Sequence, residues 1–317
     1  MGELRKTTEN NMKILVTTPT GTIGRRILAE LLAPEFSVRV IARNPSLLPQ
    51  DIQEQVEVVR ASTDNAATLR QALEGVEALF WCVPRESLET TNVRGHYERF
   101  ARSACQAIRE ARTPRVVTIS AGGKRLAGNA GPISGLHAME DILNQSGGAI
   151  RHLRCTWFME NFLTQAHQIC HDGILSYPMP GHIALPMAAA TDIADVALRW
   201  LVRGDWKGIE AVPVHGAADI SFNQAAEIFE SVLERPVRYT QLSVDDYVRN
   251  MVRSGASVHH SSRLAAMFSE LAGGISLGEP RTAESTTPTT LMTWSERELL
   301  PLFEPLGHQA EPVMSTC

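Results

Sequence analysis

The chain has 317 residues, of which 44% are apolar and 21% are charged, proportions typical of a globular protein. Thirty basic and thirty-five acidic side chains give a formal net charge of −5, so no basic surplus is present and nucleic acid is not expected as a partner. No apolar run approaches the ~20 residues of a membrane span, the first eleven residues lack the apolar core of a signal peptide, and the five cysteines form no CxxC pair. We therefore expect a cytoplasmic protein without a membrane segment or a disulfide frame.

The first half of the chain alternates between short β-rich runs and amphipathic helical stretches. Strands are expected at 13–17, 37–42, 56–60, 78–83, 115–120 and 150–155, and helices at 22–33, 66–73, 93–111 and 135–146. This alternation predicts an α/β fold, a doubly wound parallel sheet of the Rossmann type with helices on both faces.

The second half is less regular, and prolines interrupt it. Helices are expected at 191–203, 221–234, 244–254 and 259–272, with short strands near 209–214 and 237–241. We predict a nucleotide-binding domain at 12–155, an interlocked and mostly helical substrate lobe at 156–308, and flexible tails at 1–11 and 309–317. Some strands of the lobe are expected to return and extend the sheet.

A turn rich in threonine and glycine separates the first expected strand from the first helix. A doubly wound fold holds a dinucleotide pyrophosphate at this place, against free backbone amides. Gly21 would let the backbone approach phosphate, and Gly24 would let the helix pack closely on the strand; the alternative is a plain tight turn without a ligand. Thr18 occupies the place of the usual first glycine, where its Cβ restricts the backbone or crowds the phosphate unless its hydroxyl donates to phosphate instead. The predicted contacts are Thr17, Thr18, Thr20, Gly21, Thr22, Ile23 and Gly24.

The end of the second strand indicates which dinucleotide is preferred. An acidic residue here would accept hydrogen bonds from the ribose hydroxyls of NAD(H), but the chain has Arg43 followed by Asn44. A guanidinium pairs well with a 2′-phosphate, so NADP(H) is predicted over NAD(H). The alternative is an ordinary solvated surface arginine.

Several segments together resemble the NmrA-like family, atypical members of the short-chain dehydrogenase/reductase superfamily. They include KILVTTPTGTIGRRILAELL, SVRVIARNP, RVVTISAGG, GLHAMEDILNQSG and IRHLRCTWFMENFL, in the order typical of that family. The branch with LHA and LR-x-TWFMEN is similar to festuclavine-type reductases and NAD(P)H azo- or quinone-reductases. The resemblance implies NAD(P)H binding by a Rossmann domain, with a substrate held between it and the second lobe.

The resemblance also implies roles for particular residues. Cys82, Val83 and Pro84 would pass near the nicotinamide ribose, and Ser120 falls where the superfamily keeps its catalytic serine. Relatives often carry Gly-Asp near the adenine where this chain has 61–62, Ala-Ser, so the adenine contact departs from the pattern.

The proton donor of the superfamily is missing. None of the four tyrosines is followed four residues later by lysine, so the chain has no Tyr-x-x-x-Lys pair, and Leu136 is expected in the place of the lysine. His137, Ser120 or water could supply a proton, or the product anion could leave without an enzymic acid. The alternatives are a surface histidine paired with Glu140 or Asp141 and a serine bonded to the backbone.

An apolar stretch is predicted to hold the substrate. Trp157 and Phe158, with Trp81 and Tyr97 nearby, would suit a flat hydrophobic molecule such as a quinone, an azo dye, an imine or a ketone; the alternative is core packing. For the pair 160–161, Glu-Asn, a helix cap is favoured over substrate binding. The histidines show no metal spacing, and no metal is predicted.

Two functions follow from these residues. The favoured one is an oxidoreductase that uses NADPH to reduce a small hydrophobic substrate. The alternative is a non-catalytic redox sensor that binds NADP(H) and docks a partner protein, which the loss of the tyrosine and lysine also allows.

Overall fold

A parallel sheet organises the computed structural model, which describes residues 11–113, 115–123, 130–273 and 279–303. Within these residues seven strands pair in the order β10-β6-β5-β4-β1-β2-β3, and every pairing is parallel. From one edge to the other they are β10 (Ile209–Val214), β6 (Ala149–Cys155), β5 (Arg115–Ala121), β4 (Ala78–Trp81), β1 (Met12–Thr17), β2 (Phe36–Ala42) and β3 (Glu57–Arg60). The predicted doubly wound sheet is therefore confirmed.

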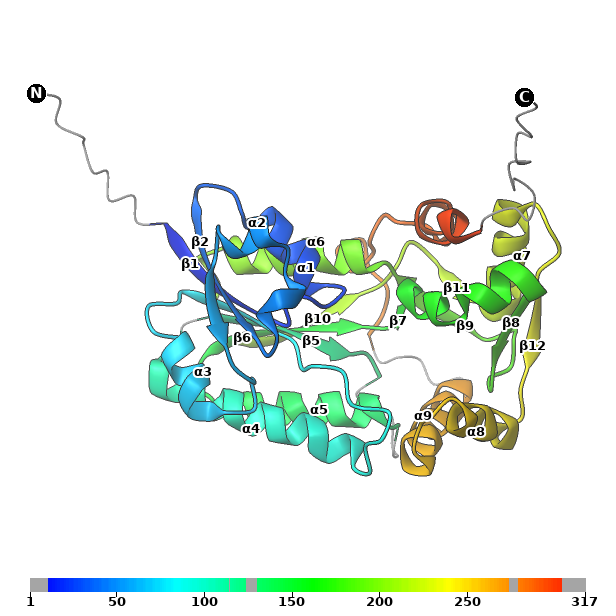
Figure 1. Cartoon of the computed structure of the whole chain (residues 1–317), viewed down its shortest axis with the longest axis horizontal. Coiled ribbons are helices and arrows are strands. Elements are labelled where there is room, and N and C mark those ends of the chain that lie inside the picture. The colour runs from blue at the N-terminus through cyan, green and yellow to red at the C-terminus, as the bar shows by residue number, and fades with distance from the viewer. Residues whose placement is uncertain (1–10, 114, 124–129, 274–278, 304–317) are drawn as a thin grey trace, which may run out of the picture.

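Helices cover both faces of the sheet (Figure 1). On one face lie α1 (Gly24–Glu30), α2 (Gln50–Gln53) and α6 (Ala190–Val202); on the other lie α3 (Ala66–Ala72), α4 (Val93–Ala111) and α5 (Pro132–Leu143). Alternation along β1 explains the two layers, because Ile14 and Val16 pack toward α1 and α6 whereas Leu15 packs toward α4. Parallel strands buried on both faces need this double cover.

The order of the strands places the site. β1 has β2 on one side and β4 on the other, so the chain leaves β1 at the point where the winding of the sheet reverses. Ligands of open α/β sheets bind at the carboxyl ends of the strands at such a point.

The second half of the chain forms a separate apolar cluster beyond the carboxyl ends of the strands (Figure 1). Its elements are β7 (Trp157–Phe158), β8 (Ile174–Tyr177), β9 (Ala184–Ala188), β11 (Asp219–Ser221), β12 (Arg238–Gln241), α7 (Phe222–Leu233), α8 (Val244–Arg253), α9 (Val258–Ala272) and α10 (Leu291–Trp294). Short helical segments at Pro45–Leu47, Met159–Gln165, Gln168–Asp172, Ser295–Leu299 and Leu300–Leu302 complete the described elements. Phe162, Phe222 and Trp294 are fully buried within this second apolar cluster.

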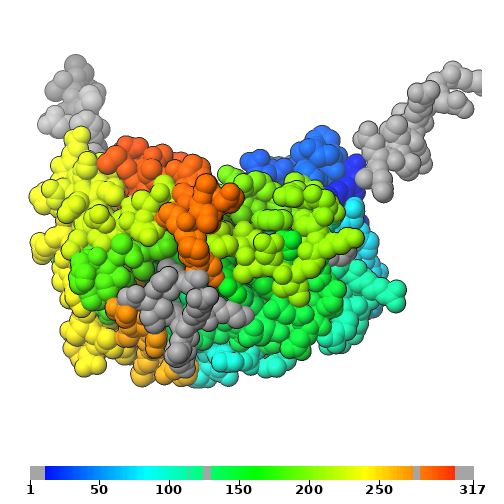
Figure 2. Space-filling model, turned by 180° about the vertical axis from the view of Figure 1, so that it is seen from behind, coloured from blue at the N-terminus to red at the C-terminus, as the bar shows by residue number. Residues whose placement is uncertain are grey.

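Two connections tie this half to the sheet. β10 pairs with β6 along its whole length, so the expected return of a strand to the sheet is confirmed. On the back face, residues 279–290 (orange in Figure 2) run over the surface as a strap between the two halves. Asp192 of α6 accepts hydrogen bonds from the backbone N–H (2.9 Å) and hydroxyl (2.6 Å) of Thr289, and Arg281 pairs with Asp219.

The structure differs from the sequence predictions mainly at the ends of elements and in short strands. α1 begins at Gly24, two residues later than expected, because Thr22 and Ile23 belong to the turn. β7, β8, β9 and β11 were not predicted, and β9 contains Pro186, which the sequence suggested as a break. Within β9, β7 pairs with Met187 and Ala188, the two residues after Pro186. The missing N–H of Pro186 therefore interrupts no hydrogen bond to β7.

Some predictions are not tested. The tail at 309–317, and the tail at 1–11 apart from Asn11, lie outside the described residues. The division into 12–155 and 156–308 stays a prediction. Among the residues described, no helix is both long and apolar enough to cross a membrane.

Candidate functional site

The turn after β1 is tight and strained. The N–H of Gly21 donates to the carbonyl of Thr18 (2.9 Å), and Thr18 has φ of +48°, the left-handed region that a β-branched residue rarely occupies. Such a backbone costs about 1–3 kcal/mol. A Cβ on Gly24 would lie only 2.1 Å from the Thr18 carbonyl oxygen, so the start of α1 can approach the turn only with glycine there. Thr18 therefore adopts a backbone conformation that favours glycine.

Thr17 anchors this turn to the neighbouring strand. Its hydroxyl donates to the carbonyl of Phe80 (3.0 Å) and accepts from the N–H of Cys82 (2.9 Å). The predicted contact residue Thr17 thus has a fully buried side chain that joins β1 to the end of β4.

A cavity of about 730 Å³ opens in front of the turn; we call it the turn cavity. It is bounded by the turn and by the segments that follow β2, β3 and β4. Its lining includes Thr18, Thr20, Gly21, Thr22, Ile23, Gly24, Arg43, Asn44, Ala61, Ser62, Thr63, Cys82, Val83, Pro84 and Arg85. Apart from Thr17, every predicted cofactor residue lines this cavity.

The polar groups of the turn cavity suit an anionic dinucleotide. Arg43 is exposed, and its guanidinium makes no hydrogen bond or ion pair within the described part of the chain. Arg39, by contrast, is buried and engaged by Glu57 at 2.9 Å. The Thr63 hydroxyl is buried beside the cavity without a partner among the described residues. A free guanidinium fits the phosphates of NADP(H).

Cys82 contributes shape rather than reactivity. Burial raises the pKa of its thiol to about 11, and a hydrogen bond with Thr18 opposes this only in part. Very little of it is thiolate near neutral pH, so it is a poor nucleophile.

A second cavity, of about 270 Å³, lies next to the turn cavity; we call it the apolar cavity. The two share five lining residues, namely Tyr97, Ile119, Leu136, Phe158 and Asn161. Further lining comes from Ser120, Ala121, Gly122, Pro132, Ile133, Cys155, Thr156, Trp157, Leu185, Met267 and Leu271. No aspartate, glutamate, lysine, arginine or histidine is among these described lining residues, so the cavity suits an uncharged molecule.

The hydroxyl of Ser120, a predicted catalytic group, is engaged by the protein. It donates to Glu140 (2.6 Å), which also receives two hydrogen bonds from Arg154 (3.0 and 2.7 Å). Arg154 pairs in turn with Glu279 of the strap at 2.6 Å. Burial alone would raise the pKa of Glu140, but the bonds from Arg154 and Ser120 outweigh it and hold this pKa at about 2. Ser120 lines the apolar cavity, yet its proton points to a permanent carboxylate.

His137, the other predicted catalytic residue, is on α5 but not among the described lining of either cavity. Its Nε2 lies 2.8 Å from the carbonyl oxygen of Ala121, so this nitrogen carries a proton that it donates to the backbone. The catalytic roles of Ser120 and His137 stay predictions, and these contacts do not favour them.

The predicted substrate residues differ in their surroundings. Trp157 is buried, and its ring packs edge-on against Tyr177 and Phe222, with centroids 5.1 and 5.3 Å away. Phe158 is half-buried and lines both cavities. Trp81, which the sequence suggested nearby, is the last residue of β4; it is fully buried and is absent from the described lining.

Sequence reasoning underrated two residues of the shared wall. The Tyr97 hydroxyl donates to the buried carboxylate of Glu86 (2.9 Å), and burial together with Glu86 raises the pKa of Tyr97 well above its usual value. Asn161 was expected to cap the following helix, but it lines both cavities. Glu160, its neighbour in the same pair, does make a cap-like contact: both oxygens accept from the N–H of Ala190 at the start of α6 (3.0 Å each).

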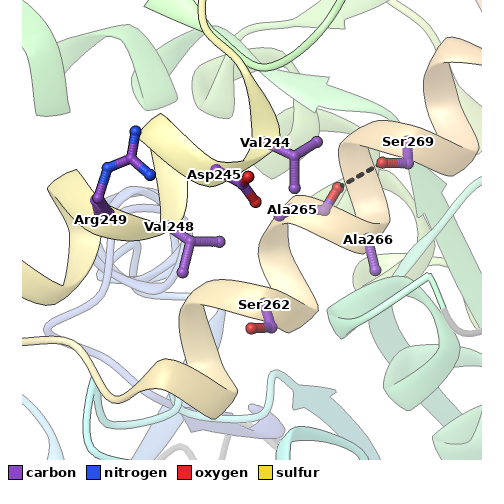
Figure 3. A pocket seen from close by; sticks show the side chains of 8 residues that line it. All are labelled: Val244, Asp245, Val248, Arg249, Ser262, Ala265, Ala266 and Ser269. Atoms are coloured by element: carbon purple, nitrogen blue, oxygen red, sulfur yellow. Dashed lines mark hydrogen bonds between the residues drawn. The ribbon is translucent and has the colours of Figure 1, made fainter.

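A third hollow lies apart from these residues, between α8 and α9 (Figure 3). Small side chains on α9, such as Ala265, Ala266 and Ser269, face Val244 and Val248 of α8 across it. No predicted site residue is there. Among the described residues no cluster of His, Cys, Asp or Glu could hold a metal ion.

Comparisons with known proteins show the family of the chain. Residues 10–284 match the sequence profile of the NmrA-like family. The chain is 28% identical over 239 residues to a (4-alkanoyl-5-oxo-2,5-dihydrofuran-3-yl)methyl phosphate reductase of Streptomyces griseus, covering 73% of this chain and 78% of the relative. It is 30% identical over 173 residues to the festuclavine dehydrogenase of Aspergillus fumigatus, covering 51% of this chain and 57% of the relative.

Solved structures share the fold. An NADPH-dependent quinone oxidoreductase of Escherichia coli, complexed with NADPH, superimposes with a TM-score of 0.76 at 23% identity. The match covers 90% of this chain and 99% of that one.

Proposed function

Since the chain belongs to the NmrA-like family, we propose that it is a reductase that uses NADPH to reduce a small, uncharged, hydrophobic acceptor such as a quinone, an azo compound, an imine or a ketone. The observation that carries this proposal is the junction of the two cavities. A dinucleotide whose phosphates lie at the turn would reach with its other end the wall shared with the apolar cavity.

The preference for NADPH rests on Arg43. The guanidinium lies after β2 on the lining of the turn cavity and is free of acidic partners among the described residues. A 2′-phosphate would give it a charge-assisted, bidentate contact. The name of one structural neighbour, an NADPH-dependent quinone oxidoreductase, points the same way.

The chain's own part in catalysis is positioning. Reduced nicotinamide supplies a hydride when it is bound, and hydride transfer needs the acceptor held close and in line. The apolar cavity supplies an apolar wall from Phe158, Ile119 and Leu136. No free acid lines the described part of this cavity, so uncharged acceptors whose hydride adduct is a stable anion, as with a quinone, suit it best.

The direct test is titration of the purified protein with NADPH and with NADH, followed by fluorescence, and then NADPH oxidation against quinones, azo dyes, imines and ketones. Arg43→Glu should weaken NADPH binding roughly 10- to 100-fold, since hydrogen bonds between charged groups contribute about 1.5–3 kcal/mol. NADH binding should change little.

Arg253→Glu is the control, because it makes the same change of charge at an exposed site on α8 that is not among the described lining of the turn cavity. Equal effects of the two variants would refute the role of Arg43. Tight NADPH binding without turnover of any acceptor would instead favour the redox sensor with a protein partner.

A further inference from the structure

Among the described residues, two hydroxyl groups line the apolar cavity without lining the turn cavity, and both donate their protons to the protein. The Ser120 hydroxyl donates to the carboxylate of Glu140 (2.6 Å). The Thr156 hydroxyl donates to the backbone carbonyl of Pro186. An ionised carboxylate and a carbonyl have no proton to give, so the direction of both bonds is fixed. Neither hydroxyl is therefore available as a donor to a bound molecule.

The hydroxyl of Tyr97, on the wall shared by the two cavities, is engaged in the same direction. It donates to the carboxylate of Glu86 (2.9 Å), and burial together with Glu86 raises the pKa of Tyr97 well above its usual value, so the hydroxyl stays protonated. A bond that uses the proton of a hydroxyl leaves the two lone pairs of its oxygen. In the described part of the chain no group donates to the oxygens of Ser120, Thr156 or Tyr97, so these oxygens remain as acceptors.

The Ser120 proton is held by a carboxylate that is itself fixed. Glu140 receives two hydrogen bonds from Arg154 (3.0 and 2.7 Å), and its pKa of about 2 keeps it ionised. Glu140 lies one turn of α5 beyond Leu136, which lines the cavity, so both residues are on the same face of the helix. The side chain of Ser120 therefore lies on the side of β5 where α5 forms the cavity wall.

The other described side chains of this cavity supply few donors. The N–H of Trp157 is buried and not accessible from the cavity, and the Cys155 thiol, a weak donor, lies 3.6 Å from the carbonyl oxygen of Leu153. Asn161 carries both an amide N–H₂ group and an amide oxygen, so it discriminates against neither donors nor acceptors. The rest of the lining is hydrocarbon, apart from the thioether of Met267. The apolar cavity thus presents mainly hydrogen-bond acceptors.

We propose that the apolar cavity selects acceptors that carry a neutral O–H or N–H group, which donates to the oxygens of Ser120 and Thr156 while the reacting end of the molecule lies at the wall shared with the turn cavity. This rests on the proposed function and narrows its substrate class. Size and apolar surface decide which molecules enter, and the two oxygens set the preference among them. Because neither oxygen belongs to the shared wall, the donor is on a substituent remote from the carbon that takes the hydride.

The test uses two non-reactive probes of similar shape, 2-naphthol and 2-methoxynaphthalene. The first carries an O–H donor that stays protonated at pH 7, and the second carries the same oxygen without a proton. Their dissociation constants are measured by fluorescence titration of the protein saturated with NADP⁺. In the double variant Ser120→Ala, Thr156→Val, which removes both oxygens, the preference for 2-naphthol over its methyl ether should fall about tenfold relative to the wild type. A general loss of structure would weaken both probes alike and leave their ratio unchanged.

The matched control is Ser103→Ala on α4. It removes a hydroxyl that also donates to a backbone carbonyl, that of Asp64 (2.7 Å), but that is not among the described lining of either cavity. The ratio of the two dissociation constants should keep its wild-type value. If the double variant does not fold, the ratio is measured in each single variant, since Glu140 keeps its two bonds from Arg154 in Ser120→Ala.

A second readout uses turnover. The value of kcat/KM is compared for 6-(hydroxymethyl)-1,4-naphthoquinone and its methyl ether, with NADPH as the reductant. The wild type should prefer the alcohol, and this preference should fall about tenfold in the double variant, mainly through KM, because the contact is made by the bound substrate as well as in the transition state.

An unchanged ratio of dissociation constants in the double variant, or in both single variants, would overturn the proposal, as would an equal fall in Ser103→Ala. Failure of the proposed function has a different signature, the absence of NADPH oxidation with any acceptor. The naphthol titration needs no reaction and is repeated without NADP⁺, so it still decides whether the cavity favours donors.

Discussion

The two cavities that meet at Tyr97 differ in whether the polar groups around them have partners within the protein. In the turn cavity the Arg43 guanidinium and the Thr63 hydroxyl have no partner among the described residues. In the apolar cavity the hydroxyls of Ser120 and Thr156 are bonded to the protein itself. The first cavity leaves the charged Arg43 guanidinium for a ligand, whereas in the second both hydroxyls are satisfied and the unpartnered Trp157 N–H is buried.

This difference separates two kinds of recognition within one site. Unpaired charge and free hydroxyls give affinity for a charged, polar cofactor through directed hydrogen bonds. A cavity whose polar groups are satisfied selects by size and apolar surface, and so it tolerates acceptors of varied chemistry. The turn cavity would thus select the cofactor by its charge, whereas the apolar cavity would select the substrate by its size and shape.

The largest expected effect comes from removing the carboxylate that engages Ser120. Glu140 is 1% exposed, and Glu140→Gln leaves the half-buried Arg154 with one charged partner fewer. Breaking a buried pair costs about 3–5 kcal/mol, so we expect urea unfolding to show a loss of about 3 kcal/mol. The glutamine is also a weaker acceptor for the Ser120 hydroxyl than the carboxylate is. This hydroxyl would then be less engaged by the protein, as Arg43 is in the turn cavity.

The same carboxylate makes the stability of the folded protein depend on pH. The pKa of Glu140 falls from an ordinary 4.5 to about 2 on folding. Its contribution to the free energy of unfolding is therefore complete above pH 4.5 and is lost as the pH falls toward about 2. The gap in stability between the wild type and Glu140→Gln should therefore narrow on acidification through this range. Glu98→Gln, which affects an ion pair on the surface of α4, should cost less than about 1 kcal/mol; an equal cost would contradict the argument.

A middle-sized effect is expected from the glycines of the turn. The added methyl of Gly24→Ala would meet the Thr18 carbonyl oxygen at 2.1 Å, so we expect about 2 kcal/mol of destabilisation and a lower NADPH affinity. For Gly21→Ala the same atom is 3.2 Å away, a contact that a small shift relieves. This variant should melt near the wild type, and a comparable loss of stability in both would show that the clash at Gly24 is not the cause.

The smallest effect, and a stabilising one, is expected from Thr18→Gly. Removal of the side chain relieves a left-handed backbone that costs about 1–3 kcal/mol, although glycine also adds freedom to the unfolded chain. We expect a net gain of about 1 kcal/mol in thermal unfolding. Thr20→Gly adds the same freedom without relieving a positive φ, so it should destabilise; if both variants behave alike, Thr18 is not strained.

The sheet and the turn could be predicted because their signals are local. A buried run such as Ile14–Val16 and a helix such as α4 show their period within a few residues, and α4 has the predicted bounds. β7 has two residues, which is too short for any period, and its place depends on β9. The sequence also placed Thr18 where the first glycine of the turn is usual, with a Cβ that would restrict the backbone or crowd the phosphate.

The contacts that decide which polar groups are free could not be predicted in this way. Ser120 is engaged because α5 brings Glu140 over the end of β5 and β6 brings Arg154 to the same carboxylate. Glu160 is held by Trp294, far along the chain, which leaves Asn161 to face the cavities. These partners follow from the packing of whole elements, and no local pattern encodes them.

The place of β10 has a consequence for how the protein is made. β6 ends at Cys155, but the strand that covers its outer edge arrives only with residues 209–214. While the chain emerges from the ribosome, the amides and carbonyls along the outer edge of β6 stay unpaired until residues 156–214 have been made. A truncated first half would expose this row to other chains, so the nucleotide-binding half is expected to aggregate when it is expressed alone.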